Sequence, residues 1–74
     1  MHAVSNEHEF MLLYDEYVGK IYNFILRSVL HRETAEDLTA TVMTNALSSI
    51  KRRRILIQNF SAWLYKIATN ELIS

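Results

Sequence analysis

The sequence contains no cysteine, no proline and a single glycine, Gly19. The lack of cysteine excludes a disulfide scaffold, a thiolate metal site and a cysteine nucleophile, and it is compatible with the reducing cytoplasm, where we expect this chain to act. Because folds of many short strands need proline and glycine in their turns, the scarcity of both over 74 residues favours long helices with short connections. No apolar run approaches a membrane span, and no signal peptide is visible after Met1. These absences favour one small all-α domain.

The residue types that carry chemistry form no recognisable constellation. His2, His8 and His31 are scattered, and no two of them have the helical spacing of a metal site. One glycine cannot build a glycine-rich phosphate loop, and no serine or threonine is set beside a histidine and an acid in a recognisable pattern. Glu36 and Asp37 form a carboxylate pair, but the first turn of an expected helix favours acids through its dipole alone. We therefore predict no enzyme, no metal and no cofactor.

Charge is distributed unevenly although the formal net charge is zero. Residues 1–37 carry seven acids against three bases, whereas residues 38–74 carry five bases against Glu71 alone. Such a layout predicts two different partners, with the basic half a candidate for binding a polyanion. A solvated surface whose halves differ by chance is the alternative. Half of the residues are apolar, which argues against disorder.

The first expected helix follows Asn6. Asn6 with Glu9 three residues later is typical of an N-cap with a capping-box partner. Gly19 costs a helix about 1 kcal/mol relative to alanine, so we expect a kink or a break near it. The apolar positions that recur at steps of three and four are Phe10, Leu13, Tyr14, Tyr17, Ile21, Phe24 and Ile25.

Two further helices complete a small three-helix bundle, the all-α fold that we predict. Thr34 is expected to cap the second helix, whose apolar stripe runs over residues 38–50. Residues 51–58 are expected to form a basic-then-apolar connector, and Asn59 to cap a third helix over residues 60–73. An extended segment in the connector would have no strand to pair with. The expected core contains Leu13, Tyr17, Ile21, Phe24, Leu38, Val42, Trp63, Leu64 and Ile67.

The basic half carries the residue types that bind single-stranded nucleic acids. Lysine and arginine neutralise phosphates, aromatic rings stack on unpaired bases, and asparagine can read a base edge. Trp63 is expected in the core with Phe60 and Ile67, which leaves Tyr65 as the ring free to stack. A solvated loop followed by a core tryptophan is the alternative. The candidate nucleic-acid-binding residues are Lys51, Arg52, Arg53, Arg54, Tyr65, Lys66, Thr69 and Asn70.

Residues 35–50 offer a second candidate surface. A helix face of small neutral groups suits docking of another protein, although an ordinary exposed face has the same composition. The polar side of this stretch is weakly charged and carries Thr39, Thr41, Thr44 and Ser48.

Three segments together resemble a known family. They are residues 10–27 (FMLLYDEYVGKIYNFILR), residues 35–38 (AEDL) and residues 60–70 (FSAWLYKIATN). In order and spacing they are similar to the second conserved region of extracytoplasmic-function sigma factors. The resemblance covers residues 10–74, and its most specific piece is FSAWLYKIA followed by Asn70.

The resemblance implies a promoter-recognition domain that docks on the clamp-helix coiled coil of the β′ subunit of core RNA polymerase. It also implies binding of the minus-ten promoter element as unpaired non-template strand. In the family, the helix that matches residues 35–50 supplies the polymerase contact. Asp37 and Leu38 match the family pattern, whereas Ala40 stands where glutamine is usual and Thr41 where glutamate is usual.

The resemblance implies which residues meet DNA as well. The connector over residues 51–59 and the helix after it match elements that capture a flipped base and line the single strand. Lys66 and Asn70 match positions that contact DNA in the family, and Thr69 stands where arginine is common. The apolar run over residues 55–57 replaces a polar loop of the family.

Two functions remain open from the sequence. The first is promoter recognition, which the basic connector, Lys66 and Asn70 favour. The alternative, favoured by Ala40 and Thr41, is a helical protein–protein interaction module: a degenerate sigma-like domain, or a fragment that binds an anti-sigma factor, without direct DNA binding. The sequence ends at Ser74 without a helix stop signal. We therefore expect one domain of a longer protein, whose C-terminal helix-turn-helix domain is absent here.

Overall fold

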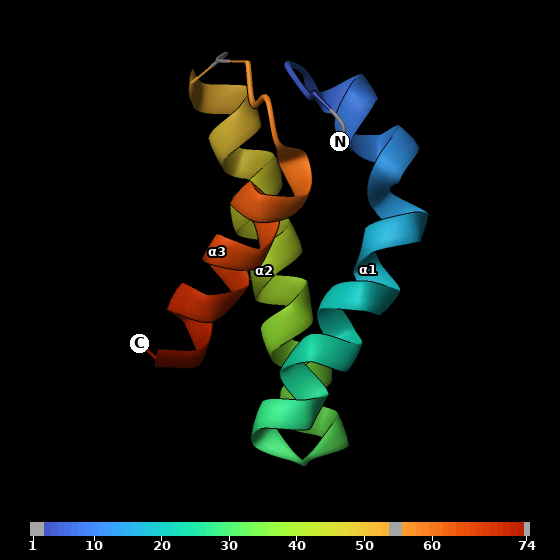
Figure 1. Cartoon of the computed structure of the whole chain (residues 1–74), viewed down its shortest axis with the longest axis vertical. Helices are drawn as coiled ribbons and strands as arrows, with labels where there is room; N and C mark the ends of the chain where they lie inside the picture. The colour runs from blue at the N-terminus through green and yellow to red at the C-terminus, as the bar shows by residue number, and fades with distance from the viewer. Residues whose placement is uncertain (1–2, 54–55, 74) are drawn as a thin grey trace.

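The chain folds into three helices in a computed structural model that describes residues 3–53 and 56–73. They are α1 (Glu7–Val29), α2 (Arg32–Arg53) and α3 (Phe60–Ile73). Figure 1 shows that α2 runs back beside α1 and that α3 then descends across α2. The predicted all-α three-helix architecture is confirmed.

The start of α1 is capped as predicted, but with a different partner for the acid. The Asn6 side-chain oxygen accepts a hydrogen bond from the Glu9 backbone N–H at 2.9 Å. The Glu9 carboxylate does not return the bond to Asn6, as a capping box would require. One of its oxygens instead accepts bonds from the Ser5 backbone N–H at 2.8 Å and the Ser5 hydroxyl at 2.9 Å. Ser5 rather than Asn6 binds the carboxylate because its backbone N–H and its hydroxyl both donate to one oxygen.

The sequence predicted a kink or a break near Gly19. The helix is continuous there, so the break is wrong. Tyr17 and Ile21 on either side are buried against the rest of the bundle. Burial of this apolar stripe outweighs the propensity cost of one glycine. A Cβ at position 19 would meet nothing within 4 Å, so packing does not demand glycine. The second half of α1 leans toward α2 (Figure 1).

Two residues turn the chain from α1 into α2. Leu30 adopts a left-handed conformation with φ 56°, and its N–H donates to the Leu26 carbonyl at 2.8 Å. The cap of α2 is His31, whose Nδ1 accepts from the Thr34 N–H at 3.2 Å. The prediction that Thr34 is the cap is therefore wrong, because the histidine ring supplies the acceptor three residues earlier and α2 already begins at Arg32.

The basic cluster belongs to a helix rather than to a connector. Lys51, Arg52 and Arg53 form the last turn of α2. The carbonyl end of a helix dipole favours cations, which explains why the helix continues through residues that we expected outside it. Arg54 lies outside the described residues.

The connector is now the segment between α2 and α3, of which the structure describes residues 56–59. It pairs with the N-terminal strap, the name we give to residues 3–6. The Val4 N–H donates to the Ile57 carbonyl at 2.9 Å, and the Ile57 N–H donates to the Val4 carbonyl at 2.7 Å. Both side chains are buried, at 0% and 6% exposure. The prediction that an extended segment here has no partner is wrong, because the chain before α1 supplies one.

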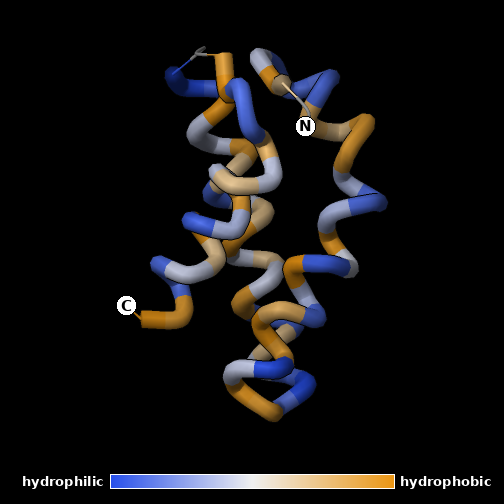
Figure 2. The backbone as a smooth tube through the Cα atoms, viewed as in Figure 1, coloured by the Kyte–Doolittle hydropathy of each residue, from blue (hydrophilic) through white to orange (hydrophobic). Residues whose placement is uncertain are grey.

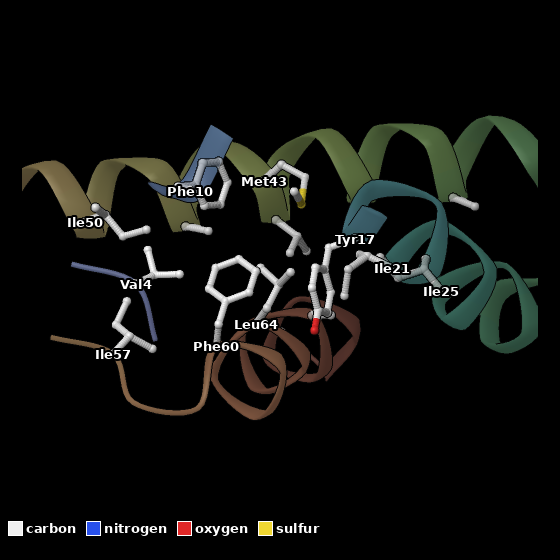
Figure 3. Close-up of a cluster of buried hydrophobic side chains, with 14 residues drawn as sticks. Val4, Phe10, Tyr17, Ile21, Ile25, Met43, Ile50, Ile57, Phe60 and Leu64 are labelled. Carbon is white, nitrogen blue, oxygen red and sulfur yellow. The ribbon is translucent and has the colours of Figure 1, made fainter. Parts of the chain in front are cut away.

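The core is centred on Phe60, the first residue of α3. Its ring is fully buried and meets the Phe10 and Tyr17 rings of α1 edge-on, with centroids 5.8 Å and 5.1 Å away. Figure 3 shows Val4, Ile57 and Ile50 at one end of this core and Ile21 and Ile25 at the other. Asn59 caps α3 as predicted, accepting from the Ala62 N–H at 3.1 Å.

The predicted core is confirmed in part. Tyr17, Ile21, Val42 and Leu64 are buried. The other five expected members pack against the core but are only partly buried: Leu13, Phe24, Leu38, Trp63 and Ile67. They lie at the edges of the helix interfaces, where one side of each ring or branch still faces water.

Phe60 and Trp63 provide a test of this core. Phe60→Ala leaves a cavity between three elements and is expected to cost about 3–5 kcal/mol, a large part of the stability of so small a domain. Trp63→Ala is expected to cost less, because part of that ring is solvated in the folded state. Thermal unfolding followed by circular dichroism measures both. A Phe60→Ala variant that melts above Trp63→Ala would contradict this core.

The contact between Glu9 and Ser5 predicts a pH dependence. Hydrogen bonds from the Ser5 backbone N–H and then from its hydroxyl lower the pKa of Glu9 below the ordinary value of 4.5. The stabilisation is therefore complete above that value and is lost as the pH falls through the lower pKa of the folded state.

The measurement is the difference in melting temperature between the parent and Glu9→Gln. It should be constant near neutral pH and shrink toward zero in acid. A difference that grows on acidification would show that the Ser5 contact does not stabilise the ionised carboxylate.

Candidate nucleic-acid interface

The basic turn, residues Lys51, Arg52 and Arg53, lies exposed at the end of α2. Figure 2 shows this end as hydrophilic. The Lys51 ammonium lies 3.7 Å from the Glu7 carboxylate of α1, and both side chains are more than half exposed, so the pair contributes little stability. Within residues 3–53 and 56–73, no ion pair engages Arg52 or Arg53. Their guanidinium groups are therefore available to an external anion.

One face of α3 combines an aromatic ring, a cation and an amide. Trp63, Lys66 and Asn70 follow at steps of three and four and so share this face. Lys66 and Asn70 are exposed, and Trp63 is half-buried with its ring tilted against Phe60 at 5.9 Å. Thr69 is exposed too, but its hydroxyl is turned back to the backbone and donates to a carbonyl one helical turn earlier. We call Trp63, Lys66 and Asn70 the α3 face.

Tyr65 lies elsewhere. Its ring packs edge-on against Phe24 of α1, with centroids 5.2 Å apart and planes at 87°, and it is half-buried. The sequence left this ring free to stack on a base, but the structure uses it between α1 and α3. Trp63 is the half-exposed aromatic residue that shares a face with Lys66 and Asn70.

The basic turn precedes the α3 face along the chain. Figure 1 shows that α3 starts below the level at which α2 ends and then runs down across α2. A rise of about 1.5 Å per residue puts Lys66 about 9 Å and Asn70 about 15 Å beyond Phe60 along the helix. Along the chain, both side chains therefore follow the basic turn and the connector.

The predicted docking residues lie on α2. Asp37, Ala40 and Thr41 are exposed, whereas Leu38 is half-buried against the core. The Thr41 hydroxyl donates to the Asp37 carbonyl at 3.1 Å, so it is directed at its own helix. Asp37 and Thr41, four residues apart, and Ala40 between them form one exposed patch.

Ala40 also borders a groove that the sequence did not reveal. One open hollow of about 620 Å³ lies between Tyr14 and Tyr22 of α1 and Glu36 and Ala40 of α2. A second, of about 310 Å³, continues from Tyr14 and Ala40 toward Met43. We call the two together the α1–α2 groove. The spacing of Tyr14 and Tyr22 on one helix face was a signal for it, but the depth depends on how the helices pack.

Other kinds of site receive no support from the described part of the chain. Residues 3–53 and 56–73 contain no group of three or more histidines or acids placed to hold a metal ion. None of the helices in these ranges has the length and apolarity that a membrane crossing requires.

Comparisons with known proteins identify the family of this chain. The family model described as Sigma-70 region 2 matches residues 13–74. The ECF RNA polymerase sigma factor BldN of Streptomyces coelicolor is 40% identical over 58 residues, which are 78% of this chain and 22% of that protein. The chain thus spans about a fifth of the curated relative, and no solved structure matches it significantly. Because the family match includes α2, α3 and most of α1, the chain belongs to the sigma-70 region 2 family, on the extracytoplasmic-function side that its motifs predict.

Proposed function

We propose that this chain is the promoter-recognition domain of an alternative sigma factor, acting in the cytoplasm. In this proposal it binds core RNA polymerase and holds the melted minus-ten element as single strand. The observation that carries the proposal is that a chain of the sigma-70 region 2 family exposes both the basic turn and the Lys66 and Asn70 side chains of the α3 face.

The chemistry of the α3 face suits an unpaired strand. Lys66 offers a charge to a phosphate, and Asn70 offers an amide that can donate to and accept from a base edge. The exposed side of Trp63 can stack on a base, an interaction worth about 1–3 kcal/mol. The basic turn extends the positive surface, and the connector that follows it is the element that captures a flipped base in this proposal.

The domain is not expected to open a duplex alone. Each unstacked base costs a few kcal/mol, and a basic half with only five lysines and arginines gains little from counterion release at physiological salt. Binding to polymerase must therefore supply part of this energy. The docking surface in the proposal is the exposed patch of Asp37, Ala40 and Thr41 with the adjoining α1–α2 groove, against the clamp helices of the β′ subunit.

A charge reversal at the basic turn tests DNA binding. Arg52→Glu with Arg53→Glu is expected to weaken binding to all single strands alike and to lower the salt slope by about 2, because two phosphate contacts are lost. Asn70→Ala is expected instead to cost about 1–3 kcal/mol at one base position. Fluorescence anisotropy of labelled promoter strands, with the chain bound to core polymerase, measures both.

The matched control for that experiment is Lys20→Glu, a charge reversal on α1 outside the proposed surface. It should leave binding and salt slope near those of the parent. If the Arg52 and Arg53 reversal behaves like this control, and Asn70→Ala does not change base preference, the assignment of the DNA surface is wrong.

An alanine at Asp37 tests polymerase docking. Asp37→Ala is expected to weaken binding to a β′ clamp-helix fragment by at least about fivefold, or ~1 kcal/mol. The melting temperature should stay nearly unchanged, since the side chain is exposed and makes no hydrogen bond to any described residue. The control is Glu16→Ala, which removes an exposed acid on α1, outside the proposed docking surface. Equal binding by the two variants, measured by calorimetry, would exclude Asp37 from the interface.

The second candidate function is a protein–protein interaction module without direct DNA binding. Ala40 and Thr41 favour it, because the family usually has glutamine and glutamate at these two positions of the docking helix. An anti-sigma factor is the partner in this alternative. A chain that captures neither the clamp helices nor a promoter strand, while still binding an anti-sigma factor, would support this function over the first.

A further inference from the structure

We infer that the N-terminal strap is a positioning element for strand binding. By pairing with Ile57, Val4 fixes which side chains of the connector face outward. The inference rests on the proposed function, in which the connector contacts the unpaired strand. It goes beyond that function because the strap, residues 3–6, precedes residue 13, where the match to the sigma-70 region 2 family begins.

The first step is the pairing itself. Val4 and Ile57 exchange two backbone hydrogen bonds, at 2.9 Å and 2.7 Å, so the connector backbone is held in extended form at this point. Both side chains are buried, and Figure 3 shows them at one end of the core with Ile50 and beside Phe60. Burial fixes the register, since a slip by one residue would turn Ile57 to solvent.

The second step follows from the alternation of an extended chain. Successive side chains point to opposite faces, so an inward Ile57 directs Leu56 and Gln58 outward. Leu56 is 57% exposed and Gln58 is also exposed. An apolar side chain can pack on the face of an unpaired base, and the glutamine amide can pair with a base edge. The strap thus sets the direction of both groups.

The third step is that the strap is itself anchored beside the basic turn. The Glu9 carboxylate accepts both Ser5 donors, and Asn6 caps α1. The next residue is Glu7, whose carboxylate lies 3.7 Å from the Lys51 ammonium of the basic turn. The strap therefore connects the start of α1, the connector and the basic end of α2. In the proposed function these elements keep a fixed arrangement when a strand binds.

Val4→Asp tests the role by placing a charge in the buried pair. Val4→Ala is a milder variant that keeps the fold if Val4→Asp does not, and Val4→Ile is the conservative variant that should restore parental behaviour. Ile25→Ala is the matched control: Ile25 is fully buried at the far end of the core, so it lowers stability without touching the connector (Figure 3).

Two readouts separate positioning from general stability. The first is amide hydrogen exchange in the 74-residue chain. The Ile57 N–H should exchange at least about tenfold faster in the Val4→Asp or Val4→Ala variant, while the N–H of Leu64 in α3 changes no more than in the Ile25→Ala control. The second is base preference, read by sequencing the single strands that the chain retains with core polymerase from a randomised pool.

The expected result is a local loss of discrimination. Preference at one or two adjacent positions should fall by about tenfold in the Val4 variants and persist elsewhere, as when one base contact is lost. Ile25→Ala and Val4→Ile should keep the parental preferences. An unchanged Ile57 exchange rate would overturn the inference, and so would faster exchange with unchanged base preference, or an equal loss of preference in Ile25→Ala.

Failure of the proposed function has a different signature. In that case the parent retains no strand with core polymerase, although its Ile57 N–H still responds to the Val4 substitutions. That outcome overturns the role of the strap in strand binding together with promoter recognition, and it leaves the strap as a structural contact alone.

Discussion

The fold depends on one aromatic contact, the Phe60 ring held edge-on between Phe10 and Tyr17. α1 and α2 form an antiparallel pair, but α3 follows a connector and has no hairpin to direct it. Because Phe60 is its first residue and is buried completely, this ring fixes where α3 starts, and the Asn59 cap fixes the direction in which it leaves. The position of every residue on the α3 face follows from that starting point. A small core can do this because edge-on aromatic pairs add a preferred orientation to the burial of area.

Helical periodicity and capping chemistry were sufficient to predict the three helices. The stripe of α1 and the caps at Asn6 and Asn59 are local patterns, and local patterns survive without tertiary information. The wrong predictions lie where another interaction outweighed the local sequence preference. Tertiary packing carried α1 through Gly19, the ring of His31 took the cap from Thr34, and the helix dipole drew the basic turn into α2. In each case the local sequence pattern was present, but contacts with neighbouring residues determined the structure that the residue adopts.

The candidate site was predictable in composition and less so in arrangement. Lys66 and Asn70 are exposed as expected, and the basic residues that the structure describes are solvent-facing. The roles of Tyr65 and Trp63 could not be deduced, because both recur at core-compatible positions and only the path of α1 shows that Phe24 covers Tyr65. The α1–α2 groove and the strap are the least predictable features. A groove is a property of two packed surfaces, and a single pair such as Val4 and Ile57 has no period to detect.

The pairing of Val4 with Ile57 also has a consequence for the order of folding. It joins residues near opposite ends of the described chain, so closing this loop costs more chain entropy than the contacts between α1 and α2 do, and it gains only two hydrogen bonds and two buried side chains. We therefore expect the helical pair to form first and this closure to come last. During synthesis Val4 must therefore remain unpaired until Ile57 has left the ribosome. The connector then reaches its final shape only when the strap pairs with it.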